Sequence, residues 1–167
     1  MHKRRKTEED YNKYFALNML KSFTVSFLIL VIPLLLNLLM VHIVFSGGTF
    51  LFIAQESIKV IPSMAEQFSH PMFYNLLCIF LFSFVGAFVG SGATALAMAF
   101  PNRFILYPLD FILWYIPCIM ESSVRGAFQP FTEYPLSKYF PGLILVLAIN
   151  VIAVLFSFFK VTKYDQV

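Results

Sequence analysis

Charged side chains are scarce in this chain: they make up 13% of its 167 residues, whereas hydrophobic residues make up 59%. A soluble domain of this size usually carries about 25% charged residues. The apolar residues are gathered into runs that reach the roughly 17 to 25 residues a helix needs to cross a bilayer. The shortage of charge therefore argues against an ordinary soluble domain and predicts an all-α, polytopic membrane protein.

Residues that commonly carry chemistry are also few. The two cysteines, Cys78 and Cys118, both lie within apolar runs, which argues against a disulfide framework. The three histidines have no ligand-like spacing to a cysteine or a carboxylate, so no metal site is predicted. The chain has no Gly-x4-Gly-Lys-Ser/Thr loop and cannot hydrolyse ATP alone by that route. We expect no catalytic residues, no cofactor and no enzymatic activity.

Segments with little or no charge predict four transmembrane helices. They cover residues 22–45, 72–100, 104–120 and 141–159. The second is longer than a span requires, so it is expected to tilt or to begin in the membrane interface. The third is marginal, because it has only 17 residues and contains two prolines and Asp110. The fourth is followed by lysines and a tyrosine, which are typical interfacial anchors.

The distribution of basic residues predicts the orientation of these spans. Six of the twelve Lys and Arg residues lie in the first 21 positions. With the N-terminus inside, four crossings place nine basic residues in the cytoplasm and three outside. We therefore expect a multi-pass protein of a cell membrane, the bacterial cytoplasmic membrane, with both termini cytoplasmic and no nucleic-acid partner. The expected divisions are a basic leader at 1–21, a transmembrane domain at 22–160 and a tail at 161–167.

Two asparagines in the predicted spans are candidate helix contacts. Asn37 lies four residues after Pro33, where its carboxamide can satisfy backbone groups that the proline frees or can bond a neighbouring helix. Asn150, in the fourth span, has the same interpretation. Contact with a ligand is the less favoured alternative for both residues.

The second span carries small residues at every fourth position. Gly86, Gly90 and Thr94 form one ridge, and a parallel ridge of Ala87, Ser91 and Ala95 lies beside it. Small residues at this spacing let helix backbones approach closely. The pattern predicts tight packing of the second span against another helix, and a substrate groove along this face is the alternative.

Asp110 is a carboxylate within an apolar, aromatic segment. Insertion of a charged residue near the centre of a transmembrane helix costs about 2.5 to 3.5 kcal/mol of free energy. Asp110 should therefore face protein or water and not lipid. Arg103 lies seven residues earlier on the same helix face, but about 10 Å away along the axis, which is too far for a direct bond. We expect a water-mediated or interhelical partner. A proton-carrying role is the less favoured alternative.

The order of several short motifs resembles the membrane subunit of type-2 ATP-binding-cassette exporters, in the six-helix form common in Firmicutes. A basic, tyrosine-rich segment leads into a Pro-Leu-Leu-x-Asn core, and the next span begins with His-Pro. A short Asn-Arg turn then precedes a proline-bearing run, and the last span ends in Lys-x-Asp. The matching residues are Lys13-Tyr14-Phe15, Ile32-Pro33-Leu34-Leu35-Leu36-Asn37, His70-Pro71-Met72-Phe73-Tyr74-Asn75, Asn102-Arg103, Leu106-Tyr107-Pro108 and Lys163-Tyr164-Asp165.

The resemblance covers the last four helices of the six in that family, as a truncated or split permease would. It implies a permease component whose partners are a cytoplasmic cassette ATPase, further permease helices in a homo- or hetero-oligomer, and the lipid bilayer. Candidate residues for coupling to the ATPase are Tyr11, Lys13, Tyr14 and Arg103. The alternative is a small accessory or bacteriocin-immunity-type membrane protein without transport activity.

Overall fold

The computed structural model describes residues 8–45, 67–100, 102–120, 123–132 and 134–164. Every element assigned in these parts is helical, so the prediction of an all-α chain is confirmed for them. The elements are α1 (Glu8–Val44), α4 (Pro71–Ala99), α5 (Arg103–Ile119), the 3-10 helices η1 (Val124–Phe128) and η2 (Leu136–Tyr139), and α6 (Phe140–Tyr164).

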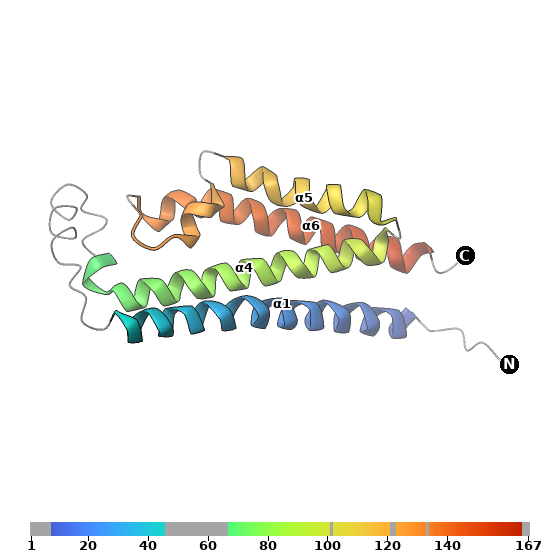
Figure 1. Ribbon diagram of the computed structural model, residues 1–167. Helices are drawn as coiled ribbons and strands as arrows, with labels where there is room; N and C mark the ends of the chain where they lie inside the picture. The colour runs from blue at the N-terminus through green and yellow to red at the C-terminus, as the bar shows by residue number, and fades with distance from the viewer. Residues whose placement is uncertain (1–7, 46–66, 101, 121–122, 133, 165–167) are drawn as a thin grey trace.

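The long helices run side by side as a bundle (Figure 1). Helix α4 is central, because it packs against α1 on one side and against α6 and α5 on the other. The described chain begins and ends at the same end of the bundle. The 3-10 helices lie at the opposite end, where they join α5 to α6.

Three helical segments are long and apolar enough to cross a membrane: Tyr11–Val44, Pro71–Ala99 and Leu136–Val161. They correspond to the first, second and fourth predicted spans. The third predicted span is a helix as well, but its 17 residues extend only about 26 Å, less than a hydrocarbon core of about 30 Å. The predicted leader at 1–21 is, from Glu8 onward, a continuous part of α1. Its residues 1–7, and residues 165–167 of the predicted tail, lie outside the described parts.

Polar side chains satisfy both ends of α5. At its start, Oδ1 of Asn102 accepts a hydrogen bond from the backbone N–H of Phe104 at 3.0 Å. At its end, Oγ of Ser123 donates to the carbonyl of Cys118 at 2.8 Å. Unpaired backbone groups at helix ends are costly in an apolar environment, so these two residues help to fix where α5 begins and ends.

The interior of the bundle is small and the outside is strongly apolar. Val85, Val124 and Val146 form the buried centre, which brings α4, η1 and α6 together. By contrast, Ile29, Ile144 and Ile152 are each 65% exposed. Large aliphatic side chains on the outside and small ones inside are the distribution expected of helices that pack within lipid.

Candidate functional site

The Gly86, Gly90 and Thr94 ridge of α4 lies against α1. A Cβ built on Gly86 would meet Cδ1 of Leu30 at 2.5 Å, and one on Gly90 would meet Oγ of Ser26 at 2.6 Å. The two helices run antiparallel (Figure 1), so each step of four residues forward on α4 meets a step of four residues back on α1. Glycine is needed at Gly90 because no space remains there for a side chain.

Hydroxyl groups reinforce the same contact. The Oγ of Ser22 and the Oγ1 of Thr94 lie 2.6 Å apart, and both hydroxyls also reach the carbonyl of Gly90, at 3.2 and 3.0 Å. Asn18 extends the row, because its Nδ2 lies 4.0 Å from Sδ of Met98. Asn18, Ser22 and Ser26 are not among the helix contacts predicted from the sequence. Their spacing of four residues on the first apolar helix mirrors the ridge of α4 and could have identified them.

Asn150 lies at the other side of α4, on α6. Its Nδ2 donates to the carbonyl of Val146 at 2.9 Å, and its Oδ1 lies against Gly92 at a point that a Cβ would occupy. The second ridge of α4, formed by Ala87, Ser91 and Ala95, is buried. The half-buried side chain of Asn150 therefore lies in the α4–α6 contact, against Gly92.

Asn37 has a different environment from Asn150. Its side chain is exposed on α1, and no hydrogen bond involves it within the described parts of the chain. It lines a groove of about 490 Å³ between the second half of α1, the first half of α4 and η1. The other lining residues are Leu34, Leu38, Val41, Asn75, Cys78, Ile79, Phe82, Phe128 and Pro130. Asn37 thus lines an open groove with a polar side chain and does not make a hydrogen bond between helices.

Asp110 lies on the half-buried face of α5, together with Leu106, Leu113 and Trp114. The remaining surface of α5 is exposed and aromatic, and it includes Tyr107, Phe111 and Tyr115. Asp110 has no ion pair or hydrogen bond with any described residue, and the exposed Arg103 does not pair with it. The interhelical partner that is one of the two expectations for this carboxylate is not among the described residues of this chain.

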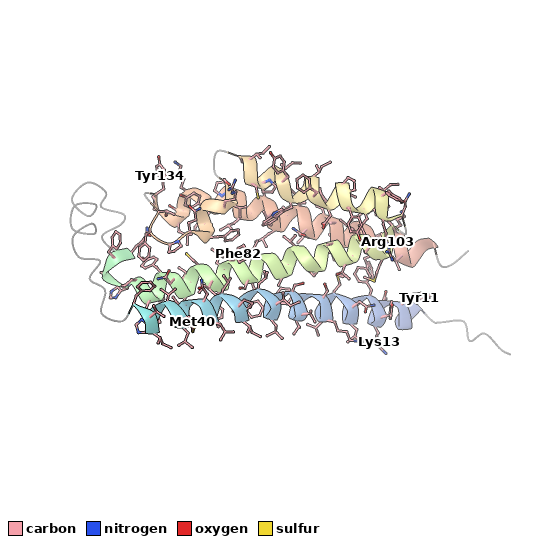
Figure 2. The ribbon with its side chains drawn as sticks, viewed as in Figure 1. Tyr11, Lys13, Met40, Phe82, Arg103 and Tyr134 are labelled. Atoms are coloured by element: carbon pink, nitrogen blue, oxygen red, sulfur yellow. The ribbon has the colours of Figure 1, made fainter. Side chains whose placement is uncertain are left out.

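The candidate coupling residues come together at one end of the bundle. Figure 2 shows Tyr11 and Lys13 at the start of α1 and Arg103 at the start of α5, all at the end where the described chain begins and ends. Tyr14 is 58% exposed in the same part of α1. Lys160, near the end of α6, places its Nζ 3.8 Å from the ring centre of Phe100. Basic and aromatic residues of three helices therefore gather at this end, where α1 also begins with the acidic residues Glu8, Glu9 and Asp10.

At the opposite end of the bundle, a pair of hydrogen bonds joins the segment before α4 to the segment between η1 and η2. The carboxamide of Gln67 both donates to the carbonyl of Thr132 at 3.2 Å and accepts from its N–H at 3.1 Å. Next to it, the rings of Phe68 and Phe131 stack at 5.0 Å. A second cavity, of about 360 Å³, is lined by Gln67 and Thr132 among others. Cys78 lines both this cavity and the α1–α4 groove.

Clusters of metal-ligating side chains do not occur within the described parts of the chain, where no three His, Cys, Asp or Glu residues come together. Both cysteines are free thiols. The polar side chains at the contacts of α4 with α1 and α6 are hydroxyls and carboxamides, which make hydrogen bonds and carry no charge at neutral pH.

Comparison with known proteins gives one informative similarity. No protein-family model and no solved structure matches the chain. The chain is 29% identical over 160 residues to the uncharacterized protein YybM of Bacillus subtilis (strain 168). The match covers 92% of this chain and 62% of YybM, so the chain spans less than two thirds of that protein's length.

Proposed function

We propose that the chain is a membrane-spanning component of an ATP-binding-cassette exporter and is driven by a separate cytoplasmic ATPase. In this proposal α1, α4, α5 and α6 all cross the bacterial cytoplasmic membrane, with both termini in the cytoplasm. Further permease helices, from a homo- or hetero-oligomer, complete the translocation pathway.

The basic residues of the two ends of the bundle support this orientation. Lys13, Lys21, Arg103 and Lys160 lie toward the end that holds the first and last described residues, whereas Arg125 and Lys138 lie toward the other. An excess of Lys and Arg is characteristic of the cytoplasmic side of a membrane protein. The interfacial aromatic residues Tyr134 and Phe100, each under a lysine, suit the two membrane boundaries.

The outer face of α5 supports a fourth crossing despite its length. Phe104 is 90% exposed, and Tyr107 and Phe111 are 67% and 62% exposed. Large exposed rings of this kind are favourable in lipid and unfavourable in water. A helix a few ångströms shorter than the hydrocarbon core is accommodated by local thinning of the bilayer, at a modest cost.

Cysteine labelling tests this topology. In protein without native cysteines (Cys78→Ser, Cys118→Ser), we expect Lys138→Cys to react with a membrane-impermeant maleimide added to whole cells. Lys13→Cys should react only after the cells are opened. Labelling of both positions from outside, or of Lys13→Cys alone, would contradict the proposed orientation.

The gathering of the candidate coupling residues at one end carries the functional proposal. Lys13 and Arg103 are 90 residues apart in the sequence but lie at the same end of the bundle. An ATPase that docks there contacts α1 and the start of α5 together. Because α1 is one continuous helix that packs along α4, a push on its exposed end is transmitted along the α1–α4 pair as a rigid movement.

Co-purification tests the function. Tagged full-length protein, isolated from its host in mild detergent, is expected to recover a cassette ATPase that mass spectrometry identifies. The double variant Lys13→Glu with Arg103→Glu should lower that recovery about tenfold, because two favourable contacts become repulsive. Lys138→Glu, at the other end of the bundle, is the matched control and should leave recovery unchanged.

Two outcomes would contradict the proposal. If the wild-type protein recovers no cassette ATPase, the chain is not a permease component, and the accessory or immunity-type function becomes the better explanation. If Lys138→Glu lowers recovery as much as the double variant does, the ATPase does not dock at the proposed end.

A further inference from the structure

The α1–α4 contact changes character along its length. In one half, Gly86, Gly90 and Thr94 bring the two helices close together, and a Cβ on Gly90 would overlap Ser26 of α1. The same antiparallel spacing continues into the other half, where Phe82 lies opposite Leu34 and Cys78 lies opposite Leu38. All four residues line the groove that also contains Asn37. Where small residues give way to bulky ones, the close contact ends and a space of about 490 Å³ opens.

The chemistry of this groove is apolar with two carboxamides. Eight of its ten lining residues are aliphatic, aromatic, proline or cysteine, and the other two are Asn37 and Asn75. None of the ten carries a charge. An anionic or cationic group bound there would have no counter-charge, which is a costly arrangement away from water.

The two carboxamides have unused hydrogen-bonding capacity. Asn75 donates from Nδ2 to the carbonyl of Pro71 at 3.0 Å, so its Oδ1 is left to accept from another molecule. Asn37 makes no hydrogen bond with the described residues, although its neighbours Leu36, Leu39 and Met40 on α1 are exposed apolar side chains. A carboxamide on an otherwise apolar membrane-facing surface is favourable only when a polar group meets it.

We propose that the groove binds an uncharged amphiphile, with a hydroxyl or amide head group at Asn37 and Asn75 and acyl chains along the apolar wall. This inference rests on the proposed function, for which it names the class of exported substrate. A peptide fits less well, because each peptide unit brings one donor and one acceptor that two asparagines cannot satisfy. A charged lipid head group fits less well because the groove holds no charge.

The position of the carboxamides suits such a ligand. Asn75 is about 6 Å from the start of α4, and Asn37 is about 10 Å from the end of α1, so both lie near one membrane boundary. Leu34, Ile79 and Phe82 continue the groove deeper into the bundle. The head group therefore stays near the interface, while the acyl chains lie in the apolar part, as they do in a bilayer.

Alkylation of Cys78 provides a direct measurement of binding. The full chain with Cys118→Ser, in mild detergent, has one thiol, and that thiol lines the groove. We expect dioleoylglycerol to slow the reaction of Cys78 with N-ethylmaleimide at least tenfold at saturation. Dioleoylphosphatidylglycerol, which has the same acyl chains and an anionic head group, should need a concentration at least tenfold higher for the same protection.

Variants locate the ligand within the molecule. Asn37→Leu should raise the dioleoylglycerol concentration that gives half protection about fivefold, the effect of one lost hydrogen bond. Leu38→Trp, which fills the groove, should abolish the effect of dioleoylglycerol. Leu39→Trp is the matched control, because Leu39 is 53% exposed and does not line the groove, and it should behave as the parent protein does.

Several results would overturn this inference. Equal protection by the anionic lipid would exclude head-group selection by the carboxamides. Unchanged protection in Leu38→Trp would place the ligand in the other cavity that Cys78 lines. Protection that appears without lipid and increases with protein concentration would show that a second copy of the chain covers the groove. The assay contains no ATPase, so it can fail while ATPase recovery succeeds, which would leave a permease component for another substrate class.

Discussion

Replacing Gly90 by leucine is expected to lower the midpoint of thermal unfolding in detergent by about 10 °C. A Cβ at this position would lie 2.6 Å from Oγ and 3.2 Å from Cβ of Ser26 on α1. The Cβ of Ser26 is fixed to the helix backbone, so relief requires the two helices to separate and not only a side chain to rotate. Overpacking of this kind costs about 3 kcal/mol, and a chain of this size loses roughly 2 to 4 °C per kcal/mol.

Separation of α1 and α4 also removes a polar contact. The hydroxyls of Ser22 and Thr94 lie 2.6 Å apart and share the carbonyl of Gly90, and neither has another helix to bond if the contact opens. Ala97→Leu is the matched control, because Ala97 lies on the exposed face of the same helix. It should shift the midpoint by less than about 2 °C. A similar loss in both variants would show that α4 is sensitive to any added bulk and that the ridge is not special.

Replacing Gly126 by alanine is expected to lower the unfolding midpoint by about 6 °C. A Cβ on Gly126 would lie 2.5 Å from Cζ and 2.9 Å from Cδ1 of Tyr139, so the added methyl group would overlap the edge of the ring. The ring of Tyr139 is rigid and can yield only by rotating as a whole about its side-chain torsions, and the contact joins η1 to η2. The expected cost of about 2 kcal/mol follows from the displacement of one 3-10 helix from the other.

A double-mutant cycle identifies the ring as the cause. Tyr139→Ala removes the clashing atoms, so Gly126→Ala introduced into that background should shift the midpoint by about 1 °C or less. The difference between the two backgrounds measures the coupling between the methyl group and the ring. If Gly126→Ala is equally destabilising with and without the ring, then the backbone of η1 requires glycine for another reason.

The α1–α4 contact connects stability with the proposed function. Its close-packed half makes the two helices one mechanical unit, and its open half supplies the groove with Asn37 and Asn75. Loss of the close contact through Gly90→Leu should therefore also alter binding in the groove. The two halves lie on the same helix pair, and a change in the separation of α1 and α4 acts on both.

The sequence alone determined that the described parts of this protein form long apolar helices and that one face of α4 is closely packed. The lengths of the apolar runs predicted the helical segments, because a bilayer of fixed thickness requires a minimum length of apolar helix. The spacing of Gly86, Gly90 and Thr94 predicted a face for close packing, because positions four residues apart lie on one side of a helix. The high cost of placing a charge in lipid predicted that Asp110 faces protein or water, and Asp110 lies among half-buried residues of α5.

Only the tertiary structure decided what each face meets. Asn37 and Asn150 received the same interpretation from the sequence, yet Asn150 packs against Gly92 and Asn37 lies in an open groove. Likewise, the small residues of α4 could all have met the same helix, but the Gly86, Gly90 and Thr94 ridge meets α1, while Gly92 meets Asn150 of α6. The physical reason is that helical periodicity fixes the direction of a side chain relative to its own axis. The neighbour in that direction depends on how the other helices are arranged around it, which no local pattern specifies.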